Sequence, residues 1–407
     1  MSSAFPPPSA PGGPPGAGAI APPGAERRRD GARIRIAVGC GCYTVGVVAG
    51  AVLLFLLFVL YPAASGVGPQ TFAAMAVGAV LAFPAALVYL TVPRLLDRYD
   101  PEPLYALALA LLWGGVAACG ISALVNTLVG DGVGHLTGQP AVGAAVGAVI
   151  SAPFVEEATK GLFILGVFLF LRREFDGIVD GIIYATFAAI GFAAVENVIY
   201  YANAGLQLGA GGVAVTFFLR GVLTPWGHPL YTSMTGIGIG IARETDKVWL
   251  RVLAPVVGYG GAVFLHMVWN GTSVFLGAFQ PGVSFAIFLL ALLLWLLFVL
   301  AFLVMVVVLV RRRGRIIRQF LLDEVALGHL SQAEVDVVTS PFGIFAARMA
   351  KGSKGVEFVR AVARLALSKW HSARAMRTQT RTVSMDFIQP LRRKIEALRA
   401  QGASPAR

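Results

Sequence analysis

The segment Pro153-Phe-Val-Glu156-Glu157-Ala-Thr-Lys160 places three ionisable side chains inside the apolar run 141–171. About 20 residues suffice to cross a hydrocarbon core of about 30 Å, so this run is long enough to span a membrane. A charge near the centre of such a helix costs on the order of 2.5 to 3.5 kcal/mol. The adjacent glutamates therefore indicate a functional site or a structural ion pair, in which Lys160 neutralises one carboxylate and leaves the other available.

The composition of the whole chain is that of a membrane protein. Of 407 residues, 57% are hydrophobic and only 13% are charged, a balance typical of polytopic membrane proteins. The net charge of +12 comes from basic residues in a tail and in loops on one side of the apolar runs. Membrane orientation explains this distribution, so we predict a lipid bilayer environment and no nucleic-acid partner. The three cysteines show no zinc-finger spacing and predict no disulfide framework.

Apolar runs separated by charged breaks predict an all-α, polytopic bundle of about eight transmembrane helices. The predicted spans are 36–61, 71–92, 104–128, 141–171, 178–203, 213–242, 252–278 and 283–310. Basic loops alternate with loops that lack Lys and Arg, which predicts a multi-pass protein of the cell (plasma) membrane with both termini in the cytoplasm. Three regions follow: a disordered Pro/Gly/Ala-rich segment 1–34, a transmembrane domain 35–310, and a basic amphipathic tail 311–407.

Several other polar residues lie inside the predicted spans. They are Glu196, Asn197, Arg220, His228, His266 and Asn270. With a helix rise of about 1.5 Å per residue, the glutamate pair, Glu196 and the two histidines all lie roughly 21 to 24 Å from the cytoplasmic ends of their helices. Four helices thus place ionisable groups in one layer of the outer half of the bilayer, which predicts one joint site near the extracytoplasmic edge.

Two chemistries suit this predicted site. In one, a glutamate activates water while a His or Asn side chain stabilises the oxyanion formed from a peptide carbonyl. In the other, a zinc ion is held by His228, His266 and a glutamate such as Glu157, and a second glutamate acts as base. Sequence alone leaves both open. The candidate catalytic residues are Glu156, Glu157, Glu196, His266 and Asn270, and the candidate supporting residues are Lys160, Arg220 and Asn197.

Structural and non-proteolytic alternatives exist. A single intramembrane histidine is often a hydrogen-bonding residue between helices, and Glu196 is also a candidate buried partner for Arg220. Carboxylate and histidine chains also serve proton- or cation-coupled transporters, although the two halves of this chain show no inverted repeat. A third alternative is a scaffold whose basic tail recruits a partner.

Six motifs follow one another along the chain: Arg98-Tyr-Asp-Pro-Glu102-Pro103, Glu156-Glu157-x-x-Lys160, Asp180-Gly-x-x-Tyr184, Phe192-x-x-x-Glu196-Asn197, His228 and His266-x-x-x-Asn270. Their combination resembles the PrsW family of intramembrane proteases over roughly residues 90–275. This family is distantly related to the CAAX-processing endoproteases, which have a histidine where this chain has Glu196.

The resemblance implies an intramembrane endopeptidase. By it, Glu156 would activate water, Glu157 and Lys160 would support it, and His266 with Asn270 would contact the scissile carbonyl. It also implies a membrane-anchored protein substrate, such as an anti-sigma factor cleaved on its extracytoplasmic side. Whether a metal takes part stays open in this resemblance.

Overall fold

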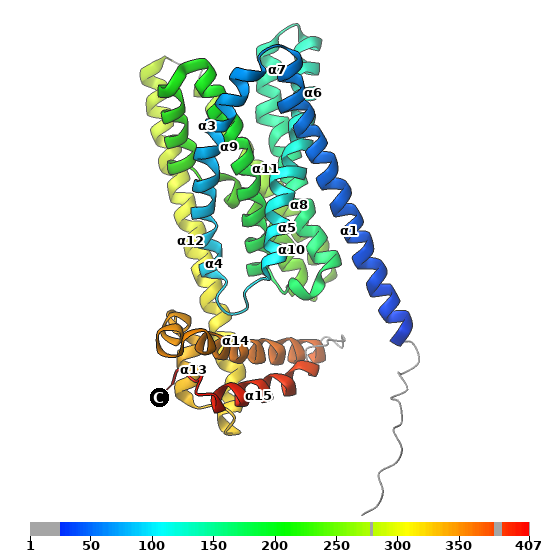
Figure 1. Ribbon diagram of the computed structural model, residues 1–407, viewed down its shortest axis with the longest axis vertical. Coiled ribbons are helices and arrows are strands. Elements are labelled where there is room, and N and C mark those ends of the chain that lie inside the picture. Colours follow the sequence, from blue (N-terminus) through cyan, green and yellow to red (C-terminus); the bar gives the residue numbers. More distant parts are fainter. Residues whose placement is uncertain (1–24, 277–279, 378–384, 407) are drawn as a thin grey trace, which may run out of the picture.

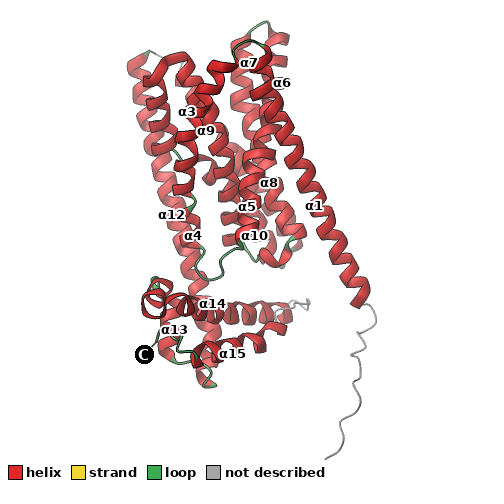
Figure 2. Ribbon diagram, viewed as in Figure 1, coloured by secondary structure: helices red, strands yellow, loops and turns green. Residues whose placement is uncertain are grey.

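The computed structural model describes residues 25–276, 280–377 and 385–406, and within these ranges the chain forms helices and no strand (Figures 1 and 2). Hydrocarbon offers the backbone no hydrogen-bonding partners, so apolar runs of this length fold as helices whose polar groups are satisfied internally. The predicted all-α, polytopic architecture is confirmed.

The helices follow one another with short connections. The first half of the chain contains α1 (Ala25–Phe55), α2 (Tyr61–Ala64), α3 (Gly68–Tyr89), α4 (Thr91–Leu96), α5 (Leu104–Leu112), α6 (Cys119–Thr137), α7 (Pro140–Val146) and α8 (Ala152–Phe170). The second half contains α9 (Ile178–Thr216), α10 (Gly227–Glu244), α11 (Val248–Leu276), α12 (Pro281–Ala326), α13 (Gln332–Thr339), α14 (Gly343–Arg377) and α15 (Met385–Ala400). Wider π-helical turns occupy 56–60, 113–118, 147–151 and 217–223. The segment 1–34, predicted to be disordered, is described only from residue 25 onward, and residues 25–34 form the first turns of α1.

Seven helical stretches of the described chain are long and apolar enough to cross a membrane. One of them, Ile178–Glu244, is 67 residues long and turns back at Gly209, whose φ of 66° lies in the left-handed region that glycine tolerates. The part of α9 that precedes Gly209 packs against α10, which follows the turn. The seven stretches therefore make eight passes, in agreement with the sequence.

Glycines allow the central helices to approach one another closely, as their four-residue spacing predicts. A Cβ atom on Gly236 of α10 would lie 2.2 Å from the carbonyl oxygen of Gly181 on α9. One on Gly240 would lie 2.4 Å from the Cα atom of Ile178. The α9–α10 contact is therefore backbone against backbone, and it fixes the relative height of two helices that carry polar residues of the predicted layer.

The last long helix, α12, runs through the predicted domain boundary at residue 310 without a break. Its C-terminal part joins α13, α14 and α15 in a folded helical unit below the spanning helices, where α14 and α15 lie across the direction of the bundle (Figure 1). Ile317, Leu321 and Phe358 are fully buried in the core of this unit. We call residues 311–406 the tail unit.

Several polar contacts tie the tail unit to the ends of the spanning helices. Arg313 Nη1 lies 2.9 Å from Asp180 Oδ1, and His371 Nε2 lies 3.0 Å from Asp176 Oδ2. Arg364 Nε lies 2.8 Å from Asp100 Oδ1. The tail unit therefore rests on the two motifs around residues 98–103 and 180–184. The start of α1 and the tail unit lie at the same end of the bundle (Figure 1), as an even number of passes requires.

Candidate active site

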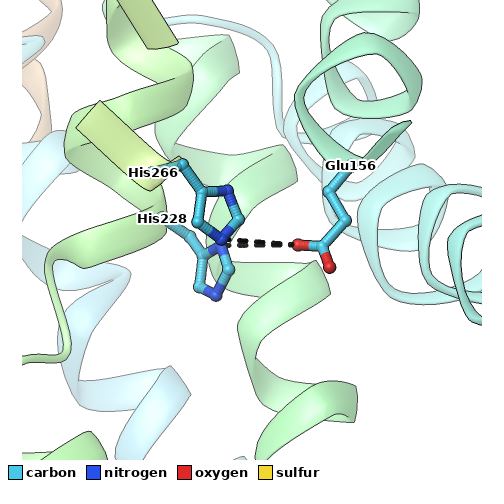
Figure 3. A group of neighbouring side chains, drawn as sticks. All are labelled: Glu156, His228 and His266. Atoms are coloured by element: carbon cyan, nitrogen blue, oxygen red, sulfur yellow. Dashed lines mark ion pairs between the residues drawn. The ribbon is translucent and has the colours of Figure 1, made fainter. Parts of the chain in front are cut away.

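Four neighbouring helices supply the ionisable groups of the predicted layer, and the structure brings these groups into contact. Glu156 and Glu157 come from α8, Glu196 from α9, His228 from the first turn of α10, and His266 from α11. Figure 3 shows the two histidine rings and the Glu156 carboxylate facing one another from separate helices.

The Glu156–Glu157 pair begins one turn after the start of α8, which has Pro153 in its first turn, where a missing backbone N–H is tolerated. Adjacent residues of a helix point about 100° apart. Lys160, which is fully buried, pairs more closely with the second glutamate. Its Nζ atom lies 2.6 Å from Glu157 Oε1 and 3.8 Å from Glu156 Oε2. Glu157 is therefore the neutralised carboxylate, and Glu156 is the available one.

Both oxygens of Glu157 have protein partners. Oε1 accepts from Lys160 and lies 3.1 Å from Nδ1 of His266, while Oε2 accepts a hydrogen bond of 2.7 Å from Oγ1 of Thr232. Because a carboxylate accepts hydrogen bonds, the proton of the His266 ring resides on Nδ1 and the lone pair resides on Nε2. Glu157, predicted as a metal ligand, thus lies behind His266 and orients it.

Glu196 acts on His228 in the same way. Its Oε2 atom lies 3.0 Å from Nε2 of His228, so the proton of that ring is on Nε2 and the lone pair is on Nδ1. The same oxygen forms an ion pair with Arg220, and Arg220 Nε donates to Oδ1 of Asn197 at 2.8 Å. Glu196 is thus both the partner of Arg220 and the carboxylate that fixes His228.

The two imidazole lone pairs converge on Glu156. Nδ1 of His228 and Nε2 of His266 each lie 4.0 Å from Glu156 Oε2 (Figure 3), and their rings are perpendicular with centroids 5.1 Å apart. Glu156 Oε2 is buried and has no hydrogen-bond partner among the described residues. Lys160 Nζ donates to the Nδ1 lone pair of His228 at 3.1 Å and is the positive charge beside this group.

These residues fit a metal ion. Glu156, His228 and His266 offer three ligand atoms within 4.8 Å of one another. Two histidines and one glutamate are a usual ligand set of catalytic zinc, with bonds of about 2.0 to 2.2 Å and ligand atoms about 3.3 Å apart. Side-chain shifts of less than about 1 Å would close the 4.0 Å separations to that distance. A carboxylate behind each ligating histidine is the usual outer-shell arrangement of such sites.

A cavity of about 840 Å³ reaches this group from the end of the bundle opposite the tail unit. Its wall runs from the turn between α6 and α7 at Gly138 and Pro140, past Asp131 of α6, to Glu156 and Glu196. Polar side chains line it along α6 and α9. Glu156 and Glu196 therefore line a space that extends toward that end of the bundle.

Asn270 takes a position that the sequence pattern does not specify. It shares a face of α11 with His266, as its spacing predicts, but its Nδ2 atom donates to the carbonyl oxygen of Ala148 at 2.9 Å. In this state Asn270 joins α11 to the π-helical turn that precedes α8. Within the described part of the chain, Asn270 forms no hydrogen bond with Glu156.

Sequence reasoning missed two residues of the site. Thr232 holds Glu157, and its position four residues after His228 on α10 would have placed both side chains on one helix face. Asn126 of α6 lies 3.4 Å from Glu156 Oε1 through Nδ2 and accepts from Ser151 through Oδ1 at 2.8 Å. No spacing in the sequence connects Asn126 with α8, because that contact arises from helix packing alone.

Comparisons with known proteins identify the relatives of this chain. A family model described as PrsW family intramembrane metalloprotease matches residues 102–311. Three relatives named Protease PrsW are each 28% identical. They come from Geobacillus kaustophilus (195 residues; 47% of this chain and 80% of the relative), Bacillus subtilis (175 residues; 42% and 73%) and Clostridioides difficile (187 residues; 42% and 71%). No solved structure gives a significant match.

The matched region contains every helix that contributes to the four-helix site, and it ends where the tail unit begins. The resemblance inferred from the motifs is confirmed, and the family leaves the transporter and scaffold alternatives without support. This chain belongs to the PrsW family of intramembrane metalloproteases and is a membrane-embedded protease.

Proposed function

We propose that this protease hydrolyses peptide bonds of membrane-anchored proteins at a divalent metal ion, zinc in the first instance, held by Glu156, His228 and His266. One observation carries the proposal. Two carboxylates fix the two histidines so that the unprotonated nitrogens of both rings lie near Glu156 Oε2, which accepts no hydrogen bond from the described residues. Three electron-pair donors directed at one point suit a metal ion, and its binding would displace the Lys160 Nζ atom from Nδ1 of His228, where it now donates at 3.1 Å.

A bound zinc ion supplies Lewis acidity, which polarises a carbonyl oxygen and lowers the pKa of water. The protein's own residues set the geometry. Glu157 and Glu196 keep each imidazole in the tautomer that ligates, and each also pairs with a cation, Lys160 or Arg220. Glu157 is thus a positioning residue, Glu196 positions His228 through Oε2, and Glu156 is left as the ligating carboxylate.

Glu196 is our candidate for accepting a proton from the attacking water. Both oxygens of Glu157 are occupied, and Glu156 directs Oε2 at the histidines. Glu196 uses only Oε2 in the hydrogen bonds formed within the described part of the chain, and it lines the 840 Å³ cavity. Its Oε1 atom is thus the carboxylate oxygen best placed to meet water from the cavity.

Lys160 is our candidate for stabilising negative charge on the scissile carbonyl oxygen. Its Nζ atom lies 3.8 Å from Glu156 Oε2 and is fully buried, and a cation in a water-excluded site stabilises a developing oxyanion far more than it would in water. Asn270, expected from the family resemblance to contact that carbonyl, would first have to release Ala148. We therefore assign Asn270 to holding α11 in position.

We infer that the substrate is a protein anchored in the same membrane, with its scissile bond near the membrane edge opposite the tail unit. The position of the cavity supports this, because it opens between α6, α7 and α9 toward that edge. The basic loops favour a cytoplasmic tail beneath a cell membrane, and cleavage would then occur on the extracytoplasmic side. A membrane-anchored anti-sigma factor would satisfy these requirements.

Cleavage by the reconstituted full-length protein tests the proposal. In proteoliposomes containing a membrane-anchored test substrate, we expect Glu156→Gln and His266→Ala to lower the cleavage rate by more than about 100-fold, the upper end of the loss caused by removing an outer-shell partner. Glu396→Gln and His329→Ala, at exposed positions of the tail unit, are the matched controls and should cleave at the wild-type rate. Cleavage by Glu156→Gln at near the wild-type rate would refute the proposal.

A further inference from the structure

The connection between α13 and α14 carries an apolar surface that the fold leaves uncovered. Phe342 is 74% exposed, Phe345 is 65% exposed and Met349 is 74% exposed. On the opposite face of the same helix, Ala347 is fully buried and Ile344 packs against the core of the tail unit. We call residues 341–354 the arm. Its inner face belongs to the tail unit, and its outer face is apolar and without a protein partner in the described chain.

Positive charges surround this apolar face. Arg348, Lys351 and Lys354 follow within the arm, and no acidic residue occurs between positions 337 and 356. No ion pair of these three side chains forms within the described ranges of the chain. Elsewhere in the tail unit, Lys369, Arg392 and Arg399 pair with buried glutamates.

The arm lies at the level where the spanning helices end. Arg98, in the loop between α4 and α5, donates through Nη1 to the carbonyl oxygen of Pro341 at 2.8 Å. Figure 1 shows the first part of α14, in orange, directly below the lower ends of the spanning helices. Gly352, with a φ of 61°, turns the helix and separates this part from the rest of α14.

We propose that the arm is an interfacial anchor that inserts Phe342, Phe345 and Met349 into the bilayer surface next to the tail unit, with its cations on anionic lipid headgroups. An amphipathic helix with a basic border binds a membrane surface through buried apolar area and attraction to anionic lipid. Continuity with the spanning helices favours a lipid partner, because Pro341 accepts a hydrogen bond from Arg98, which lies in the loop between two apolar helical stretches, one ending at Arg94 and the next beginning at Leu104. The anchor would hold the tail unit against the membrane.

Fluorescence quenching in nanodiscs that hold one copy of the full-length protein tests this anchor. An environment-sensitive dye is attached at Met349→Cys, or at the control Glu396→Cys in α15, after Cys40 and Cys42, which are exposed, are changed to serine. In phosphatidylcholine–phosphatidylglycerol discs, we expect nitroxide-labelled lipids to quench the dye at 349 and to leave the dye at 396 nearly unquenched. Phe345→Ser should reduce the quenching at 349.

Charge gives a second readout. Each Lys or Arg near an anionic surface contributes about fivefold to binding. Lys354→Gln should therefore lower the ratio of inserted to released arm by about fivefold in phosphatidylglycerol-containing discs and change it little in discs of phosphatidylcholine alone. Equal quenching at 349 and 396 would overturn the proposal. A dye at 349 that is shielded from water when several copies share a membrane, but not in single-copy discs, would also overturn the proposal. The partner of the arm would then be a second copy of the chain.

Discussion

Glu156 and Glu157 are chemically identical neighbours that the fold assigns to different tasks. The helical rotation of about 100° between them was enough to predict that one would be neutralised and the other left available. It could not decide which, because Lys160 is one turn from both. The decision comes from α10 and α11, whose Thr232 and His266 complete the hydrogen bonds of Glu157.

Thr232 offers a test at the residue scale. Its hydroxyl donates to Glu157 Oε2 at 2.7 Å, and the side chain is fully buried. Thr232→Val keeps the shape but leaves a buried carboxylate oxygen unpaired, which costs about 1 to 3 kcal/mol. We expect metal affinity and cleavage rate to fall by about tenfold, the lower end of an outer-shell effect.

Thr232→Ser is the control for that variant, since it keeps the hydroxyl and should bind metal nearly as well as the wild type. Metal affinity is measured by competition with a chelating dye on the purified full-length protein. Equal affinity in the valine and serine variants would mean that the hydrogen bond to Glu157 does not position the site.

At the scale of elements, the sixth span is a broken helix. The π-helical turn ends at Leu223, and Thr224 is its C-cap. The next helix, α10, begins at Gly227 and has His228 in its first turn. The sequence predicted a continuous span over 213–242, although Pro225 disfavours helical backbone at the residue before it. Non-helical backbone at membrane depth is tolerated where protein or a cavity satisfies it. The break permits Arg220 and His228 to reach Glu196 together.

The close contact of α9 and α10 gives a prediction at this scale. A Cβ atom on Gly236 would meet the backbone of Gly181 at 2.2 Å, whereas one on Gly260 of α11 would meet no atom within 4 Å. Gly236→Ala should therefore force the helices apart, at a cost of about 1 to 3 kcal/mol, and lower both the melting temperature and the cleavage rate.

Gly260→Ala is the matched substitution, because it offers the same gain in helix propensity of about 1 kcal/mol without a clash. We expect its melting temperature in detergent to equal or exceed that of the wild type. If both alanine variants melted at the same temperature, close packing of α9 on α10 would not be what holds Glu196 and His228 together.

At the scale of the whole molecule, the sequence predicted the number of passes and the common depth of the polar groups. Both follow from a fixed helix rise and a fixed membrane thickness. The lateral order of the helices does not follow from them, so the contact of Asn126 with Glu156 was not foreseeable. The same holds for the tail unit, whose Arg313 pairs with Asp180, 133 positions earlier in the chain. Amphipathic stretches predicted helices in the tail but not their docking on the family motifs.

The central claim is that Glu156, His228 and His266 hold a metal ion on which cleavage depends. Elemental analysis of the purified full-length protein, with cleavage assayed before and after chelation, tests it most directly. We predict near-stoichiometric zinc in the wild type, its loss in His228→Ala and in His266→Ala, and activity that chelation abolishes and added zinc restores. Full cleavage by metal-free protein would contradict this account and make Glu156 the base of a glutamate-type protease.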